Sequence, residues 1–231
     1  MVDRKIFIFD FDGTLVDSYS CLPEIYKSIA VKVGLKGKSV TEFVKRALEY
    51  ENLWDYLENY DRKSWWTMIF EEFSLKLDNK ALEDLLRFYW VTRAEKSFVV
   101  ENCAETLEIL KSKGKRLVIV AGNDGLKSIK RMRIEKSGLS KYFDEIFIVG
   151  EDAKNRVEAI KIVANRYNVN FGEIVFVDDK PSAINEAKSA VKNITAVRVK
   201  FKSTFKPASS EGCLCDFEIE RINDLLKVLE I

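Results

Sequence analysis

Two aspartates near the N-terminus, Asp10 and Asp12, are the residues of this sequence best placed to do chemistry. They come directly after the apolar run Ile6–Phe9, and Gly13 follows them. Residues two apart in an extended chain point to the same side, so both carboxylates can face one point. Ligands in parallel sheets bind at the carboxyl ends of strands, and a glycine lets the chain turn sharply there. The spacing therefore predicts a polar site at the end of a buried strand.

A second acidic pair, Asp178 and Asp179, follows another apolar run, Ile174–Val177. Pro181 comes soon after, at a position where the first turn of a helix accepts proline without losing a hydrogen bond. Carboxylate and backbone oxygens are the ligands that suit Mg²⁺, a hard cation. Acidic residues therefore follow two of the predicted strands, and their oxygens are of a kind that suits this cation.

The composition excludes several other chemistries. The chain has no histidine, so a histidine base, a histidine metal ligand and a Ser-His-Asp triad are all ruled out. Acid–base work must fall to carboxylates or lysines. The 38 basic and 37 acidic side chains nearly cancel, which argues against a nucleic-acid or anionic-membrane partner.

Cysteine usage and hydropathy favour a soluble, cytoplasmic protein. No zinc-type Cys-x-x-Cys pair occurs, and a bridge between Cys213 and Cys215 would close a very tight ring, so we expect Cys21, Cys103, Cys213 and Cys215 to be reduced and partly buried. The first apolar run is too short for a signal peptide, and no stretch approaches the roughly 20 apolar residues of a membrane span.

Short apolar runs alternate with helical patterns over most of the chain, which predicts an α/β protein with a parallel sheet covered on both faces. The predicted strands are Lys5–Phe9, Arg116–Ala121, Glu145–Val149, Ile174–Val177, Thr195–Val199 and Phe217–Ile219. The helices between them are Ala104–Lys113, Gly125–Ser137, Lys154–Tyr167 and Pro181–Ala190.

The stretch from about Leu15 to Ser97 breaks this rhythm, because it shows no clear strand. Its helical patterns are Pro23–Val33, Val40–Leu57, Lys63–Phe73 and Ala81–Ala94. We interpret it as an all-helical insert, with a cap at 16–97 and a core formed by 1–15 and 98–231. The insert holds all four tryptophans, which either fill its own core or line a pocket that faces the active site.

The nine-residue string Asp10–Ser18 resembles the first motif of the haloacid dehalogenase-like hydrolase superfamily. The resemblance implies a Rossmann-like core and an aspartyl-phosphate mechanism. Asp10 would attack phosphorus, and Asp12 would protonate the leaving group and later deprotonate water. Gly13 and Thr14 are expected to contact the phosphoryl group. Dehalogenating members generally lack the second aspartate, so Asp12 favours phosphate chemistry over carbon–halogen chemistry.

Two further motifs extend the resemblance. Asp178 and Asp179 are similar to the fourth motif, which implies Asp179 as a Mg²⁺ ligand and Asp178 as an outer contact. Asp10 and the backbone carbonyl of Asp12 would complete the metal site. Lys154 stands where the superfamily places the lysine of its third motif, and it would neutralise the phosphoryl oxygens.

The second motif departs from the family pattern. Members end this strand with a serine or threonine that binds a phosphate oxygen, but here the position falls on Ala121 or Gly122, neither of which has a hydroxyl. Backbone N–H groups of Gly122 and Asn123 at the start of the coming helix, or the Asn123 side chain, could take over. The loss of one such contact costs about 1–3 kcal/mol.

The sequence thus predicts a Mg²⁺-dependent hydrolase of a small phosphorylated metabolite, with the helical cap choosing the substrate. Three alternatives stay open: a phosphomutase with the same motifs, a binding or regulatory protein that keeps the fold with little activity, and a 2-haloacid dehalogenase. The sequence does not determine the substrate or the oligomeric state.

Overall fold

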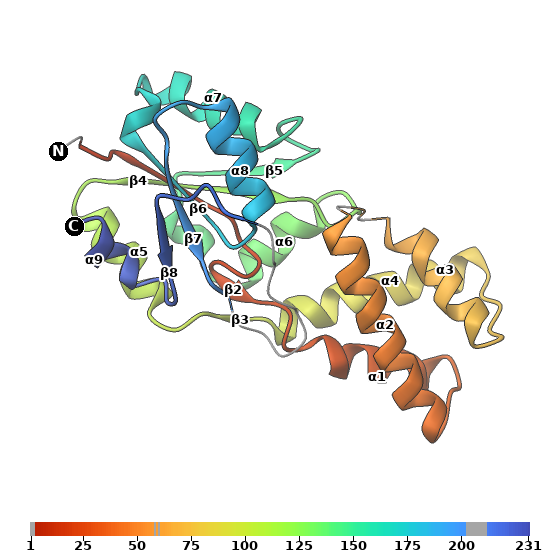
Figure 1. The fold of residues 1–231 in the computed structure, drawn as a ribbon. Helices are drawn as coiled ribbons and strands as arrows, with labels where there is room; N and C mark the ends of the chain where they lie inside the picture. Colours follow the sequence, from red (N-terminus) through yellow and green to blue (C-terminus); the bar gives the residue numbers. More distant parts are fainter. Residues whose placement is uncertain (1–2, 58, 60, 202–211) are drawn as a thin grey trace.

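The computed structural model describes residues 3–57, 59, 61–201 and 212–231. Its centre is a six-stranded sheet with the strand order β5-β4-β1-β6-β7-β8, in which all neighbours run parallel (Figure 1). The predicted α/β fold with a Rossmann-like sheet is confirmed. The strands are β1 (Ile6–Phe9), β4 (Arg116–Gly122), β5 (Glu145–Val149), β6 (Ile174–Asp178), β7 (Thr195–Val199) and β8 (Phe217–Ile219).

The central strand β1 is buried along its whole length, as its uninterrupted apolar run predicts. It pairs with β4 on one side and β6 on the other, so that Phe9 lies level with Ile119 and Val177. All these strands end at one edge of the sheet. The residues that follow β1, β4 and β6 are therefore brought together.

Helices cover both faces of the sheet (Figure 1). On one face, Phe7 and Phe9 share a hydrophobic cluster with residues of α5 (Cys103–Ser112), α6 (Ile129–Lys136) and α9 (Asp224–Val228). On the other face, the alternate residues of β1 pack with α7 (Arg156–Tyr167) and α8 (Pro181–Ala190). Short 3₁₀ helices lie at Ser140–Tyr142 and Phe171–Glu173.

Four helices form a separate body beyond the carboxyl edge of the sheet, here called the helical cap (Figure 1). They are α1 (Leu22–Lys32), α2 (Lys38–Tyr56), α3 (Arg62–Glu72) and α4 (Asn79–Lys96). They enclose their own hydrophobic cluster, in which Trp65, Trp66 and Trp90 are each no more than 2% exposed. The tryptophans thus do build a cap core, as one of the two sequence interpretations holds. None of the helices in the described ranges has the length and apolar character to cross a membrane.

A second, two-stranded sheet that the sequence did not indicate lies where the chain passes between core and cap. Here β2 (Val16–Asp17) pairs antiparallel with β3 (Phe98–Val99). Two-residue strands are too short to give an alternating pattern, which explains why the sequence interpretation missed them. The predicted division at residues 15/16 and 97/98 falls beside this pair and stays a prediction.

Candidate active site

The carboxylates of Asp10, Asp178 and Asp179 gather at the carboxyl edge of the sheet. All three are buried, and each offers an oxygen within 4.8 Å of the oxygens of the other two. The backbone explains the cluster, because the N–H of Asp10 donates to the carbonyl of Val177 at 2.9 Å and so continues the register of β1 and β6. The two acidic motifs therefore meet, as the sequence predicted from the carboxyl ends of their strands.

One guanidinium faces this cluster. Nη2 of Arg156 lies 3.6 Å from Asp10 Oδ1, and Nε lies 3.5 Å from Asp178 Oδ2. Burial and the carboxylate of Asp178 raise the pKa of Asp10 well above its ordinary value, with Arg156 opposing the shift. Burial, opposed by Arg156, also raises the pKa of Asp178, to about 6. Burial therefore disfavours the charged form of both carboxyls, and Arg156 offsets only part of this effect.

The donor set fits a divalent cation. Three carboxylates and one guanidinium leave a formal charge of −2, and hard carboxylate oxygens are the ligands that Mg²⁺ prefers. Asp10, Asp178 and Asp179 would hold such an ion. The Asp12 carboxylate lies outside this group of three. A metal contact through the Asp12 backbone carbonyl stays a prediction.

Gly13 is required by the closeness of the two acidic motifs. Its φ is +81°, and a Cβ built on it would lie 2.7 Å from Asp179 Oδ2 and 2.8 Å from Asp179 Cγ. No side chain fits between this turn and the Asp179 carboxylate. Thr14, the other predicted phosphate contact, is fully buried, and within the described part of the chain its hydroxyl has no hydrogen-bond partner. Neither residue lines the pocket described below.

Asp12 is held by cations from α6 rather than by the metal-type cluster. Its carboxylate forms ion pairs with Lys130 and Arg133 and accepts a hydrogen bond from the Ser18 hydroxyl. Asp124 shares both cations, at 2.9 Å from Lys130 Nζ and 3.0 Å from Arg133 Nη1. Burial would raise the pKa of Asp12, but the charges of Arg133 and Lys130 outweigh it and hold that pKa well below its usual range.

The two candidate positions for the missing hydroxyl, Ala121 and Gly122, lie at the end of β4. Gly122 lines the pocket, whereas Ala121 is fully buried and does not. The Asn123 side chain is engaged on both sides, because its amide donates to the Val149 carbonyl at 2.9 Å and its oxygen accepts from the Gly125 N–H at 2.8 Å.

The helix after β4 begins later than predicted. Gly125 has a φ of +78° and Ser128 a φ of +65°, and α6 starts only at Ile129 rather than at Gly125. The N–H groups of Gly122 and Asn123 therefore do not lie at a helix N-terminus, and that part of the sequence interpretation is wrong. Left-handed residues within 125–128 interrupt the helical turn, which explains the delay.

Lys154 is placed differently from the sequence prediction. It is exposed, precedes α7 and does not line the pocket, while its backbone N–H donates to Glu158 Oε2 at 2.5 Å. Asn155 caps the helix by accepting from the Glu158 N–H at 2.8 Å. The first residue inside the helix, Arg156, is the one that turns toward Asp10 and Asp178. The cation beside Asp10 is thus an arginine two residues after Lys154.

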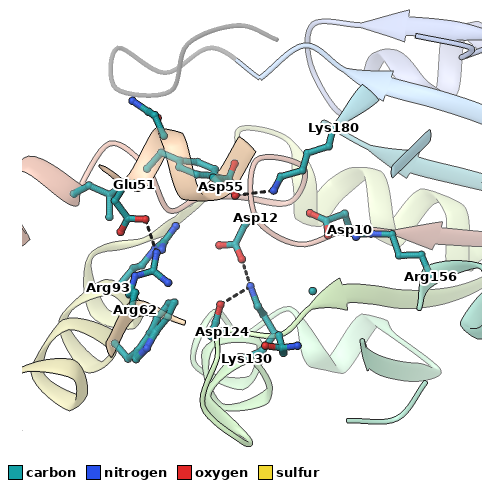
Figure 2. A pocket seen from close by; sticks show the side chains of 16 residues that line it. Asp10, Asp12, Glu51, Asp55, Arg62, Arg93, Asp124, Lys130, Arg156 and Lys180 are labelled. Atoms are coloured by element: carbon teal, nitrogen blue, oxygen red, sulfur yellow. Dashed lines mark hydrogen bonds and ion pairs between the residues drawn. The ribbon is translucent and has the colours of Figure 1, made fainter. Parts of the chain in front are cut away.

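A pocket lies between the acidic cluster and the helical cap (Figure 2). Cap residues supply one wall: Glu51 and Asp55 from α2, Arg62 from α3, and Trp90 and Arg93 from α4. Asp55 Oδ1 also lies 2.7 Å from Nζ of Lys180, which follows the second acidic pair, so an ion pair joins cap to core across the pocket (Figure 2). Trp90 therefore belongs both to the cap core and to the pocket wall.

Sequence reasoning missed the pocket cations Arg62, Arg93, Lys130, Arg156 and Lys180, together with Arg133 and Asp124 beside them. Only the α6 segment shows a pattern that could have indicated its cations, because Lys130 and Arg133 are three apart and share one face of the helix. Whether that face turns inward depends on packing, which spacing does not determine.

Fold and site together define a class of α/β enzyme, in which carboxylates work at the carboxyl edge of a parallel sheet beneath a helical lid. The model of the haloacid dehalogenase-like hydrolase family matches residues 4–190. The chain belongs to the haloacid dehalogenase-like hydrolase family and is a hydrolytic enzyme.

Relatives and solved structures agree with this assignment. Over 198 residues the chain is 27% identical to the phosphorylated carbohydrates phosphatase of Thermotoga maritima, which covers 79% of this chain and 80% of the relative. The crystal structure of a HAD phosphatase from Thermococcus onnurineus shares 28% identity, with a TM-score of 0.60 and 97% coverage of both chains. The magnesium-bound HAD-hydrolase YfnB of Bacillus subtilis, 16% identical, shares the fold with a TM-score of 0.74 and full coverage of both chains.

Proposed function

We propose that this protein is a Mg²⁺-dependent phosphomonoester hydrolase, acting on a small phosphorylated metabolite through an aspartyl-phosphate on Asp10. The observation that carries the proposal is the buried cluster of Asp10, Asp178 and Asp179 with the guanidinium of Arg156 facing it. A carboxylate is a weak nucleophile, and it becomes effective when the phosphoryl group is clamped by cations. The phosphatase relatives support the same reaction class.

Three residues of the pocket have roles in the proposed reaction. Asp10 attacks phosphorus and forms the covalent intermediate. Arg156 takes the part predicted for Lys154 and neutralises phosphoryl oxygens, because its guanidinium already lies 3.6 Å from Asp10 Oδ1. Asp12 is ionised here, because Arg133 and Lys130 lower its pKa, so it must first be protonated to give a proton to the leaving oxygen; as a carboxylate it later takes one from the attacking water. A bound Mg²⁺ would supply charge neutralisation at the phosphoryl group.

Closure of the cap is part of the same proposal. The ion pair between Asp55 and Lys180 joins the two bodies across the pocket, and a closed cap keeps bulk water from the reacting atoms. The cap residues that face the pocket would then select the substrate. A cytoplasmic location stays a prediction from the sequence.

Phosphate release from a panel of phosphomonoesters, with and without Mg²⁺, tests the proposal. We expect release that depends on Mg²⁺ and is abolished by Asp10→Asn. Asp84→Asn is the matched control, because Asp84 is an exposed acid on α4, and it should behave like the parent. If no ester is turned over above the background of Asp10→Asn, the catalytic proposal fails and the binding-protein alternative takes its place.

The two enzymatic alternatives, a phosphomutase and a dehalogenase, would each give a different product. Interconversion of sugar phosphates without release of phosphate would identify a mutase. Chloride release from 2-chloro acids without added metal would identify a dehalogenase and would overturn the argument from Asp12.

A further inference from the structure

Positive charge is concentrated on the cap side of the pocket. Three guanidinium groups surround the indole of Trp90, with Cζ atoms at 4.6 Å for Arg62, 5.4 Å for Arg93 and 5.3 Å for Arg133 from the ring centroid. All three arginines are at most 8% exposed. Like charges gathered this closely in a dry region repel one another unless anions balance them.

The buried carboxylates nearby do not balance this charge. Glu51 pairs with Arg62 Nη2 at 2.5 Å, while Asp12 and Asp124 pair with Arg133 and Lys130. Asp55 on the same wall is neutralised by Lys180, so these four cations against three carboxylates leave a formal charge of +1 on this side of the pocket.

Arg93 carries the excess. Its guanidinium donates to the Ser18 carbonyl at 3.1 Å, the Ser18 hydroxyl at 3.2 Å and the Tyr89 hydroxyl at 2.8 Å. All three acceptors are neutral, and in the described ranges no carboxylate lies within ion-pair distance of Arg93. Nε of Arg62, beside it on the pocket wall, has no hydrogen-bond partner in the same ranges. A guanidinium has five N–H donors in a planar fork that matches a carboxylate.

From this charge excess we infer that the substrate carries a second anionic group, a carboxylate, which binds at Arg93 on the cap side of the pocket. The inference rests on the proposed phosphomonoesterase function, and it makes the substrate class phosphorylated hydroxy acids rather than neutral phosphorylated alcohols. A second phosphoryl group is the other anion that arginine binds. The short path from Arg93 through the Ser18 hydroxyl to Asp12 favours the smaller carboxylate.

The position of Arg93 limits the size of the substrate. The Ser18 hydroxyl, 3.2 Å from Arg93 Nη2, itself donates to Asp12, the residue proposed to serve the leaving oxygen. Two successive hydrogen bonds span about 6 Å. The carboxylate therefore lies only a few bonds from the ester oxygen, as in a small phosphorylated hydroxy acid of roughly two to four carbons.

Matched substrates test this in the parent protein. 3-Phosphoglycerate and glycerol 3-phosphate differ by a carboxylate in place of a hydroxymethyl group, and we expect kcat/KM to favour the acid by at least about 10-fold. A bisphosphate without a carboxylate, glycerol 1,3-bisphosphate, forms the third arm. Preference for the bisphosphate over the acid, or equal use of acid and alcohol, overturns the inference.

Variants of Arg93 then separate substrate binding from structural support. In Arg93→Met kcat/KM should fall for both substrates, because Arg93 also holds Ser18 beside Asp12, but the acid-over-alcohol ratio should fall by a further factor of about 10 to 100. Arg93→Lys should retain part of the preference. Arg87→Met, at an exposed position of the same helix, should match the parent. Equal loss for both substrates would assign Arg93 a purely structural role and overturn the inference.

A binding measurement keeps the test independent of turnover and of how the variants fold. Calorimetry on the parent protein compares 3-phosphonopropionate with propylphosphonate. Neither compound can be hydrolysed, and only the first carries a carboxylate. Tighter binding of the carboxylated phosphonate by at least about 10-fold supports the subsite even if no ester is hydrolysed, in which case only the proposed function fails. Equal affinity, or no binding of either compound, overturns the inference.

Discussion

Replacing Gly13 with alanine should disrupt the acidic cluster, because this glycine faces two separate constraints. The first is its φ of +81°, which costs an alanine about 1–2 kcal/mol. The second is space, since the new Cβ would lie 2.7 Å from Asp179 Oδ2, and overpacking of a buried site costs about 1–3 kcal/mol. Together they predict a loss of about 2–5 kcal/mol in the free energy of unfolding.

Gly114→Ala provides the control that separates the two terms. Gly114 has a φ of +72°, is exposed, and has no heavy atom within 4 Å of the point where a Cβ would lie, so its substitution should cost only the backbone term. Urea unfolding measures both variants. In Gly13→Ala the displaced Asp179 should also weaken Mg²⁺ activation by at least about 10-fold, measured as the Mg²⁺ concentration that gives half-maximal activity. If Gly13→Ala matches Gly114→Ala in stability and in Mg²⁺ dependence, the close approach of the two motifs is refuted.

Three further predictions concern the site and one concerns the hydrophobic core. Arg156→Met should lower kcat by at least about 100-fold, because it removes the cation beside Asp10, whereas Lys154→Met should change kcat by less than about 3-fold. Equal effects of the two substitutions in a kinetic assay would contradict the role proposed for Arg156. Gly122→Ser should fold normally, because its Cβ would lie 3.7 Å from Arg156 Nη2, and should raise kcat/KM up to about 10-fold by restoring the hydroxyl; unchanged kinetics would show that the hydroxyl is not needed here. Lys130→Met should lower the free energy of unfolding, measured in urea, by about 3–5 kcal/mol, because it leaves Asp12 and Asp124 facing one guanidinium. The double variant with Asp124→Asn should recover part of that loss. Lys127→Met, at an exposed position, should leave the stability unchanged. Burial raises the pKa of the Cys103 thiol to about 12, so at pH 8 it stays protonated and should react with a thiol reagent only after unfolding; rapid labelling of Cys103 in the folded protein, located by peptide mass analysis, would contradict this.

The sheet could be predicted from the sequence because its strands are continuous apolar runs. Thr195–Val199 and Phe217–Ile219 occupy the predicted ranges, and β1 differs by one residue. The meeting of Asp10 with Asp178 and Asp179 was equally predictable, since carboxyl ends of neighbouring parallel strands share an edge. Short elements without periodicity, such as the β2–β3 pair, could not be found in this way.

The cations of the site could not be predicted from spacing. Lys154 and Arg156 are two apart, and which of them turns inward depends on where α7 begins, one residue after its cap at Asn155. Arg62 and Arg93 are far apart in the sequence, and they share a wall of the pocket only because α3 and α4 pack in the cap. With 38 basic residues in the chain, no local pattern identifies the few that are buried.

The β2–β3 pair has a consequence for how the cap can be changed. Because Val16 lies opposite Val99 and Asp17 opposite Phe98, the chain leaves and re-enters the core at neighbouring points. The four cap helices are therefore an excursion whose two ends already meet, and the core sheet is continuous without them. We expect that a lid of different length or sequence can be grafted between Asp17 and Phe98 without altering the strand order. The substrate specificity proposed for the cap should then change with the lid, while Asp10, Asp178 and Asp179 stay in place.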